Sequence, residues 1–193
     1  MGNASWSNVD WTAHAANTAP LDREEIFTQK NTIHPDLDPS KFRFRESVAS
    51  EANPNPTPII LASDVTGSMG VLAETIIKTD LGVIMEELYD RQPVPNPQIL
   101  CMATGDAYVD QAPIQVTQFE SSIVLAQQMS KFWIEGGGGA NAGESYLLAW
   151  FFAAYKTKCD AIRKHKRKGY LFTIGDEAPL PTLTRDQIKK FLG

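Results

Sequence analysis

Three oxygen-bearing side chains follow one short apolar run at alternate positions. Asp64, Thr66 and Ser68 come directly after the run 59–63, which reads Ile-Ile-Leu-Ala-Ser, and Gly67 permits a tight turn between them. A carboxylate and two hydroxyls on one turn are hard oxygen ligands, which divalent cations such as Mg²⁺ prefer. The spacing therefore predicts a metal site, with Mg²⁺ as the first choice and Mn²⁺ or Ca²⁺ as alternatives.

A second acid, Asp176, supports this interpretation. Asp64, Thr66 and Ser68 alone could equally cap a following helix, because these residue types accept backbone N–H groups at a helix start. Asp176, however, follows another apolar run, 170–174. Ligand sites of open α/β sheets lie beyond the carboxyl ends of the strands, so we expect Asp176 to join Asp64 there.

Alternating strands and helices must position these residues. The apolar runs and helical periodicities predict strands at 59–63, 99–104, 113–119 and 170–174, and helices at 71–89, from 121 or 122 to 132, at 142–163 and at 184–192. This alternation predicts an α/β fold with an open, doubly wound, mostly parallel sheet flanked by helices.

Residues 59–69 resemble the first strand and the Asp-x-Ser/Thr-x-Ser motif of von Willebrand factor A-type (vWA) domains, in a bacterial or phage-like variety. The resemblance extends over residues 58–177. In that family the motif and a later Asp form a metal-ion-dependent adhesion site (MIDAS), which leaves one coordination position for a carboxylate of a partner. The resemblance implies metal binding by Asp64, Thr66, Ser68 and Asp176.

The chain departs from the family pattern in the second loop. Where the family has a Thr, this sequence has Ala140 or Asn141, shortly after the glycine run 136–139. Asn141 is the candidate replacement ligand, through its amide oxygen, and Glu144 is an alternative, through a water. We expect the glycine run to form a mobile wall of the site, because consecutive glycines carry no side chains to pack.

Two regions are expected along the chain, an extension over 1–57 and a vWA-like domain over 58–193. The extension contains several turn formers and five large aromatic residues, Trp6, Trp11, Phe27, Phe42 and Phe44. That much aromatic surface is unusual for a solvated tail. We expect the extension to wrap around the domain or to bind a partner.

The composition of the chain argues against several classes of function. With 193 residues and a formal net charge of −5, the chain lacks the positive field of a nucleic-acid or anionic-membrane binder. Cys101 and Cys159 match no metal-binding spacing, so we expect reduced, buried thiols. With no secretory signal pattern and no membrane-spanning run, the expected location is cytoplasmic, or the virion if a phage encodes the chain.

The leading functional hypothesis is a protein-binding module, not an enzyme, that recognises an acidic group of a partner through a MIDAS-like site. The alternative is a structural or assembly component, for example of a phage virion, that binds neighbouring subunits. A hydrolase using Ser68 is disfavoured, because Thr66 replaces the first Gly of a nucleophile elbow and no His is well placed as a base.

The sequence also leads to predictions for an acidic loop, a basic segment and the last strand. Asp106 and Asp110 are interpreted as a turn former and a solvated acid, and the basic residues 163–168 as a solvated helix end. The sheet is expected to lack the last strand of the family, which leaves 170–174 as an exposed edge. Residues 1–57, a partner chain or further sequence could cover that edge, and the latter two are favoured because 1–57 has few strand-like runs.

Overall fold

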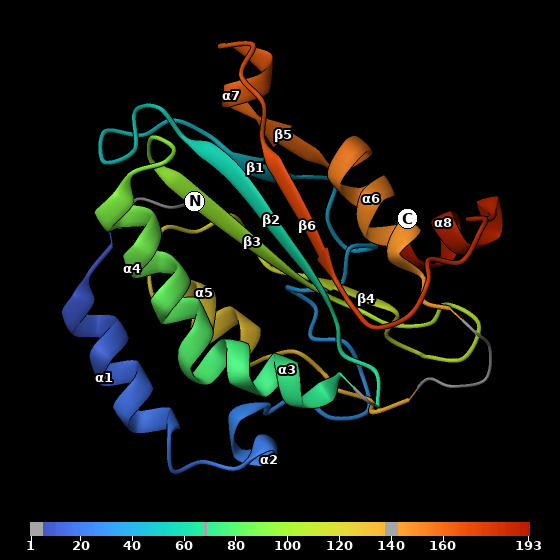
Figure 1. Cartoon of the computed structure of the whole chain (residues 1–193). Coiled ribbons are helices and arrows are strands. Elements are labelled where there is room, and N and C mark those ends of the chain that lie inside the picture. The colour runs from blue at the N-terminus through green and yellow to red at the C-terminus, as the bar shows by residue number, and fades with distance from the viewer. Residues whose placement is uncertain (1–5, 68, 138–142) are drawn as a thin grey trace.

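The computed structural model describes residues 6–67, 69–137 and 143–193. Its centre is a four-stranded sheet in the order β4-β3-β2-β6 (Figure 1). The strands β2 (Thr57–Asp64), β3 (Pro97–Thr104) and β6 (Tyr170–Ile174) are parallel, and β4 (Ile114–Val116) is antiparallel to β3. The predicted α/β class with a mostly parallel sheet is confirmed. A separate parallel pair joins β1 (Arg45–Ser47) to β5 (Thr157–Cys159).

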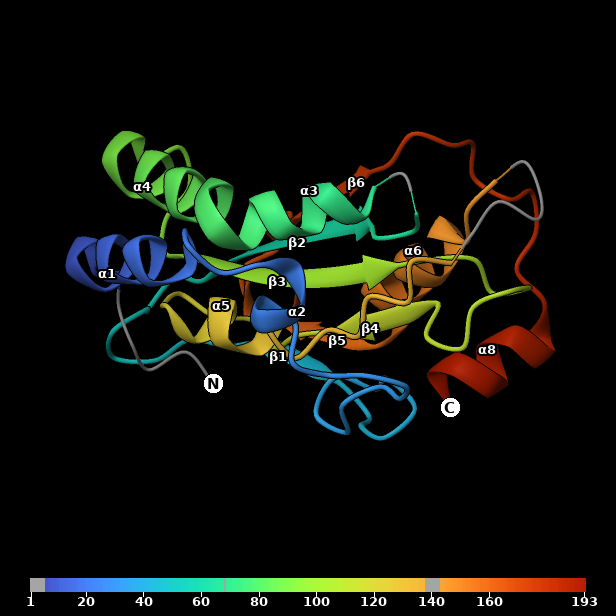
Figure 2. The ribbon, with the colours of Figure 1, turned by 90° about the horizontal axis from the view of Figure 1, so that it is seen from below.

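Helices cover both faces of the sheet (Figures 1 and 2). One layer holds α1 (Asn8–Thr18), α2 (Arg23–Ile26), α5 (Val124–Met129) and a long continuous helix made of α3 (Gly70–Thr75), the π-helical turn η1 (Ile76–Asp80) and α4 (Leu81–Arg91). The other layer holds α6 (Tyr146–Tyr155) and α8 (Arg185–Leu192), and α7 (Asp160–Arg163) projects beyond the sheet.

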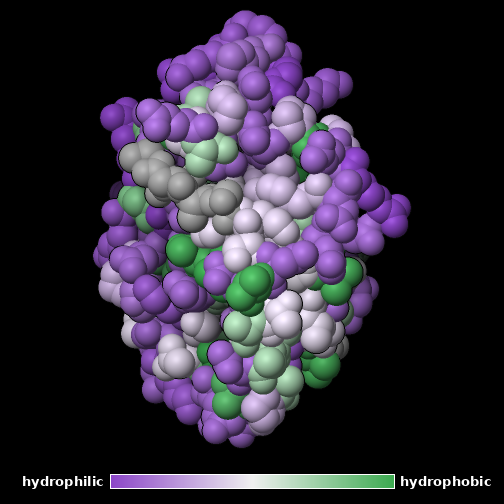
Figure 3. Space-filling model, turned by 90° about the vertical axis from the view of Figure 1, so that its left-hand side faces the viewer, coloured by the Kyte–Doolittle hydropathy of each residue, from purple (hydrophilic) through white to green (hydrophobic). Residues whose placement is uncertain are grey.

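Each face of the sheet has its own core because successive strand residues point to opposite sides. On β2, Ile59 packs into the core beneath α3 and α4, whereas Ile60 and Ala62 pack beneath α6. The extension 1–57 contributes to the first core through buried residues, namely Trp11, Ile26, Phe27 and Leu37. On the side of the molecule where α1 and α4 lie, the remaining apolar surface is dispersed among polar residues (Figure 3).

The expected single helix at 142–163 is wrong, because the segment forms α6, β5 and α7 instead. The helix ends at Tyr155, and Thr157, a β-branched residue that favours strands, begins β5. The new strand pairs with β1 of the extension. The sequence of 142–163 cannot reveal this pairing, since the partner strand lies more than 100 positions earlier.

Two other boundaries differ from the prediction. The strand expected at 113–119 spans only Ile114–Val116, because the Thr117 hydroxyl accepts a hydrogen bond from the Cys101 amide at 2.9 Å and interrupts the ladder. The helix expected to end at 132 stops at Met129. The terminal helix is confirmed, with Thr184 and Gln187 forming a reciprocal capping box.

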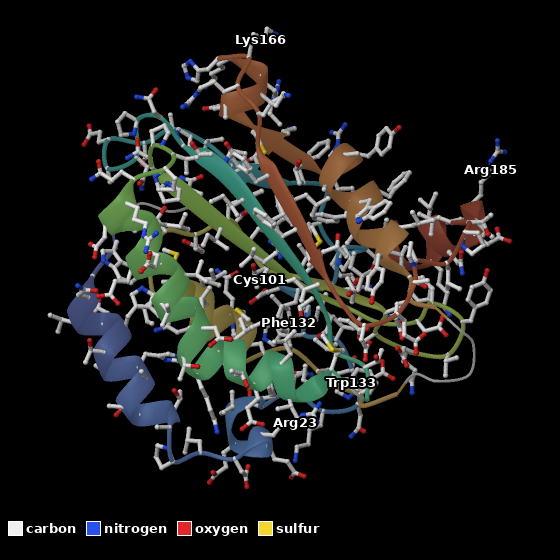
Figure 4. All side chains as sticks on the ribbon, in the orientation of Figure 1. Arg23, Cys101, Phe132, Trp133, Lys166 and Arg185 are labelled. Atoms are coloured by element: carbon white, nitrogen blue, oxygen red, sulfur yellow. The ribbon has the colours of Figure 1, made fainter. Side chains whose placement is uncertain are left out.

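Cys101 and Cys159 are free and buried, as expected, and burial raises the pKa of the Cys101 thiol to about 12. Figure 4 shows Cys101 near the middle of the sheet. None of the helices in the described segments is long and apolar enough to cross a bilayer.

Candidate functional site

The candidate metal ligands that the structure describes lie at the carboxyl ends of β2 and β6. Asp64 is the last residue of β2, and Ser63 pairs with Ile174, the last residue of β6. Asp176 therefore follows the neighbouring strand at the same edge of the sheet, two residues beyond the paired position. Asp64 is fully buried, Thr66 is buried at 7% exposure, and Asp176 is exposed.

Hydrogen bonds fix both oxygens of the Asp64 carboxylate. Its Oδ1 accepts from the backbone N and from the Oγ1 of Thr66, each at 2.7 Å. Its Oδ2 accepts from the hydroxyl of Tyr146 at 3.2 Å. Burial and the charge of Asp64 both raise the pKa of Tyr146, so this hydroxyl stays a donor. The turn thus presents the carboxylate in one orientation.

Sequence reasoning missed Tyr146, which lies in the first turn of α6 among apolar residues. The sequence feature that could have indicated a contact here is Gly175, which lies just after β6. A Cβ atom at Gly175 would collide with the Tyr146 hydroxyl. Only glycine leaves this hydroxyl room to reach across the end of β6.

Asp110 is buried at 8% exposure, so its interpretation as a solvated acid is wrong. Gly105 and Gly137 lie against its carboxylate, and a Cβ atom on either would collide with it. Its Oδ2 accepts from the Asp106 amide at 2.8 Å. Asp106 is fully buried and does form a turn, since its Oδ1 accepts from the Tyr108 amide at 2.8 Å.

Glu144 is the most perturbed acid of the region. It is 2% exposed, and burial, followed by the negative charges of Asp64, Asp106, Asp110 and Glu177, raises its pKa to about 8. Within the described segments its Oε2 lacks a hydrogen-bond partner, as do Asp106 Oδ2 and Thr104 Oγ1. Burial is also the first cause of the raised pKa of Asp110.

Four buried carboxyl groups thus lie within each other's electrostatic reach, on Asp64, Asp106, Asp110 and Glu144. None of the four forms an ion pair with a described residue. Burying a charge without a partner costs several kcal/mol. Carboxylate and hydroxyl oxygens are the ligand types that a hard cation such as Mg²⁺ prefers.

Two candidate ligands, Ser68 and Asn141, lie outside the described residues, and so does half of the predicted mobile wall, residues 138 and 139. The described start of the glycine run lies beside the Asp64 turn, because the Gly67 amide donates to the Gly137 carbonyl at 2.8 Å. Across the described chain, no three His, Cys, Asp or Glu side chains are grouped as a metal site. The candidate set contains only two such residues, Asp64 and Asp176.

A groove of about 350 Å³ borders the site. It shares Trp133, Glu135 and Gly136 with the small cavity that Thr66 and Asp110 line. Arg23 and Lys30 also line it, and the Nη2 of Arg23 has no hydrogen-bond partner among the described residues. Figure 4 shows Arg23 and Trp133 at the end of the molecule beneath α3.

Comparisons with protein-family models, with curated proteins and with solved structures found no match to this chain.

Proposed function

We propose that this chain is a protein-binding module that holds Mg²⁺ at the carboxyl end of β2 and recognises an acidic group of a partner. Asp64, Thr66, Ser68 and Asp176 are the proposed ligands, with Asn141 as a further one. The bound ion would supply an open coordination position for a carboxylate, as the resemblance to vWA domains implies. The proposal contains no catalytic step.

The observation that carries the proposal is the uncompensated negative charge around Asp64. Folding brings Asp64, Asp106, Asp110 and Glu144 into one buried region, and no cationic side chain of the described residues is paired to any of them. A divalent ion supplies the missing positive charge, and hydroxyl ligands such as Thr66 leave part of that charge for an incoming acid.

The neighbouring groove offers aromatic surface and one cationic side chain to a partner. Phe27 and Trp133 line it together with Arg23, while Lys30 there is already paired with Glu24 at 3.1 Å. A peptide lying in the groove therefore meets aromatic surface and the Arg23 guanidinium. Aromatic and Arg side chains are the residues that most often dominate protein interfaces. A partner would place its acidic group at the ion and its flanking residues in this groove.

Calorimetric titration tests the proposal with two probes. We expect MgCl₂ to bind at one site, and a short peptide with one Asp among apolar residues to bind only when Mg²⁺ is present. The matched peptide with Asn in place of Asp should bind at least about tenfold more weakly, since the carboxylate completes the ion. Absence of Mg²⁺ binding, or equal binding of both peptides in EDTA, would contradict the proposal.

The exposed edge at β6 favours a second candidate, a structural component that assembles with neighbouring subunits. That function does not require the ion. Assembly that proceeds equally well in EDTA, in a protein that binds no Mg²⁺, would favour it over the first.

A further inference from the structure

The two edge strands of the sheet, β4 and β6, differ in whether other residues of the chain cover them. All three residues of β4, at one edge, are at most 1% exposed. The extension covers this edge, because the Val116 amide donates to the Leu37 carbonyl and the Arg45 guanidinium donates to the Val116 carbonyl, both at 2.9 Å. The chain therefore closes the β4 edge with its own residues.

The edge at β6 is open. Within the described part of the chain β6 pairs only with β2, which confirms the expected edge. Four of its five residues are large and apolar and remain well exposed, namely Tyr170 at 46%, Leu171 at 39%, Phe172 at 51% and Ile174 at 38%. Proteins normally protect such an edge with charges, prolines or a covering segment, since its free N–H and C=O groups accept another strand.

The charges at the two ends of β6 are opposite in sign. A basic stretch, 163–168, precedes the strand, and the acidic pair Asp176 and Glu177 follows it. Both ends are largely exposed. Figure 4 shows Lys166 at the outer end of the projecting loop. A parallel neighbour with the same sequence would bring like charges together, whereas an antiparallel one brings opposite charges together.

The spacing of the charges is symmetric about Phe172. Lys168 lies four positions before Phe172, and Asp176 lies four positions after it. Arg167 and Glu177 are likewise equidistant. When Phe172 of two antiparallel copies stands opposite itself, Lys168 and Arg167 of one copy therefore come beside Asp176 and Glu177 of the other.

We propose that two copies of this chain pair through β6 in antiparallel orientation, with the two-fold axis at Phe172, to form one continuous sheet. Such an interface uses the same patch on both copies, as two-fold dimers do. Phe172 faces Phe172 of the second copy, and Tyr170 faces Ile174. Aromatic and β-branched cross-strand pairs of this kind stabilise antiparallel sheets, as do opposite charges.

The dimer is independent of the proposed metal site, and its test is performed in EDTA. Sedimentation velocity from about 1 to 100 µM should show the wild-type protein passing from monomer to dimer. Phe172→Lys should be monomeric throughout, and because Phe172 is half exposed the variant should fold. Tyr155→Lys, at a 67% exposed residue of α6, is the matched control and should still dimerise.

A charge exchange tests the register. Arg167→Glu and Glu177→Lys, at positions that face each other in this register, should each raise the dimer dissociation constant on the order of tenfold, because each change affects two symmetric contacts. The double variant should recover most of the loss. Asp176 is left unchanged because it is a proposed metal ligand.

Hydrogen exchange locates the interface. Amides of 170–174 should exchange more slowly at high protein concentration in the wild-type protein and not in Phe172→Lys. A wild-type protein that stays monomeric at about 100 µM overturns the proposal, since the edge then serves a different occupant or none. A dimer that Phe172→Lys leaves intact, or a double variant without recovery, also overturns it.

Discussion

Two regions of the molecule bury aspartate in different ways. Asp160, at 6% exposure, accepts from the Lys164 ammonium at 2.8 Å and from the Ala49 amide at 3.1 Å. These contacts hold the pKa of Asp160 below its usual value, with the bond to Lys164 as the main cause. At the carboxyl end of β2, Asp64 accepts only neutral donors, and nearby Glu144 has a pKa of about 8.

The difference shows where the chain supplies its own counter-charge and where it does not. Lys164 lies one helical turn from Asp160, so a local sequence feature balances that acid. Asp64 ends β2, Asp106 and Asp110 share the loop before β4, and Glu144 precedes α6. Folding concentrates these four acids, and none of them is paired with a lysine or arginine among the described residues. We infer that an external cation balances the second region.

The largest expected effect is a pH dependence of stability from Glu144. Its folded pKa of about 8 lies above the value of 4.5 for a free carboxyl, so the folded state holds a proton that the unfolded state releases. Stability in EDTA should therefore be highest below about pH 4.5, fall by a few kcal/mol as the pH rises, and level off above about pH 8. Chemical denaturation from pH 5 to 9 measures this slope.

Glu144→Gln should flatten that slope, because the amide does not titrate. Glu86→Gln, on the exposed side of α4, is the matched control and should keep it. Saturating Mg²⁺ should also reduce the slope in the wild-type protein, since a cation favours the ionised carboxylates. A slope that survives in Glu144→Gln would mean that another group binds the proton.

A smaller effect is expected from Tyr146→Phe, which removes the donor to Asp64 Oδ2. Hydrogen bonds to charged groups contribute about 1.5 to 3 kcal/mol, so the free energy of unfolding should fall by about that amount. Tyr155→Phe is the control, because Tyr155 is 67% exposed. Equal stabilities of the two variants would show that the Tyr146 hydroxyl does not hold the carboxylate.

The smallest expected effect on stability comes from removing the ion pair of Asp160. Lys164→Met removes an ion pair whose lysine is 65% exposed, and such helix pairs contribute only about 0.3 to 0.5 kcal/mol. The pKa of Asp160, followed by NMR, should rise toward its usual value. A change in the pKa of Glu144 on this substitution would show that the two regions are electrostatically coupled, which would contradict their separation.

Local sequence was sufficient to predict which end of the sheet carries the candidate ligands. The apolar run before Asp64 and the run before Asp176 predict two strands, and parallel pairing brings their ends together. The capping box at Thr184 was also predictable, since its partner Gln187 lies three residues away. These features depend on short spacings, which a sequence displays directly.

The remaining features depend on contacts between distant segments. Tyr146 reaches Asp64 across 82 positions, and Asp110 is buried because two separate glycines leave space for it. The break after Tyr155 requires the partner strand β1. No local pattern specifies these contacts, so sequence reasoning placed Asp110 in solvent and extended one helix through β5.

The most direct test of the account compares Mg²⁺ binding in the two regions through thermal unfolding. Wild-type protein should gain about 2.7 kcal/mol when Mg²⁺ reaches 100 times its dissociation constant, which is a rise in Tm of about 5 °C or more. Asp160→Asn should be destabilised yet keep that rise, whereas Asp64→Asn, which retains the acceptor for Thr66, should lose it. A wild-type Mg²⁺ response in Asp64→Asn would contradict the assignment of the metal site.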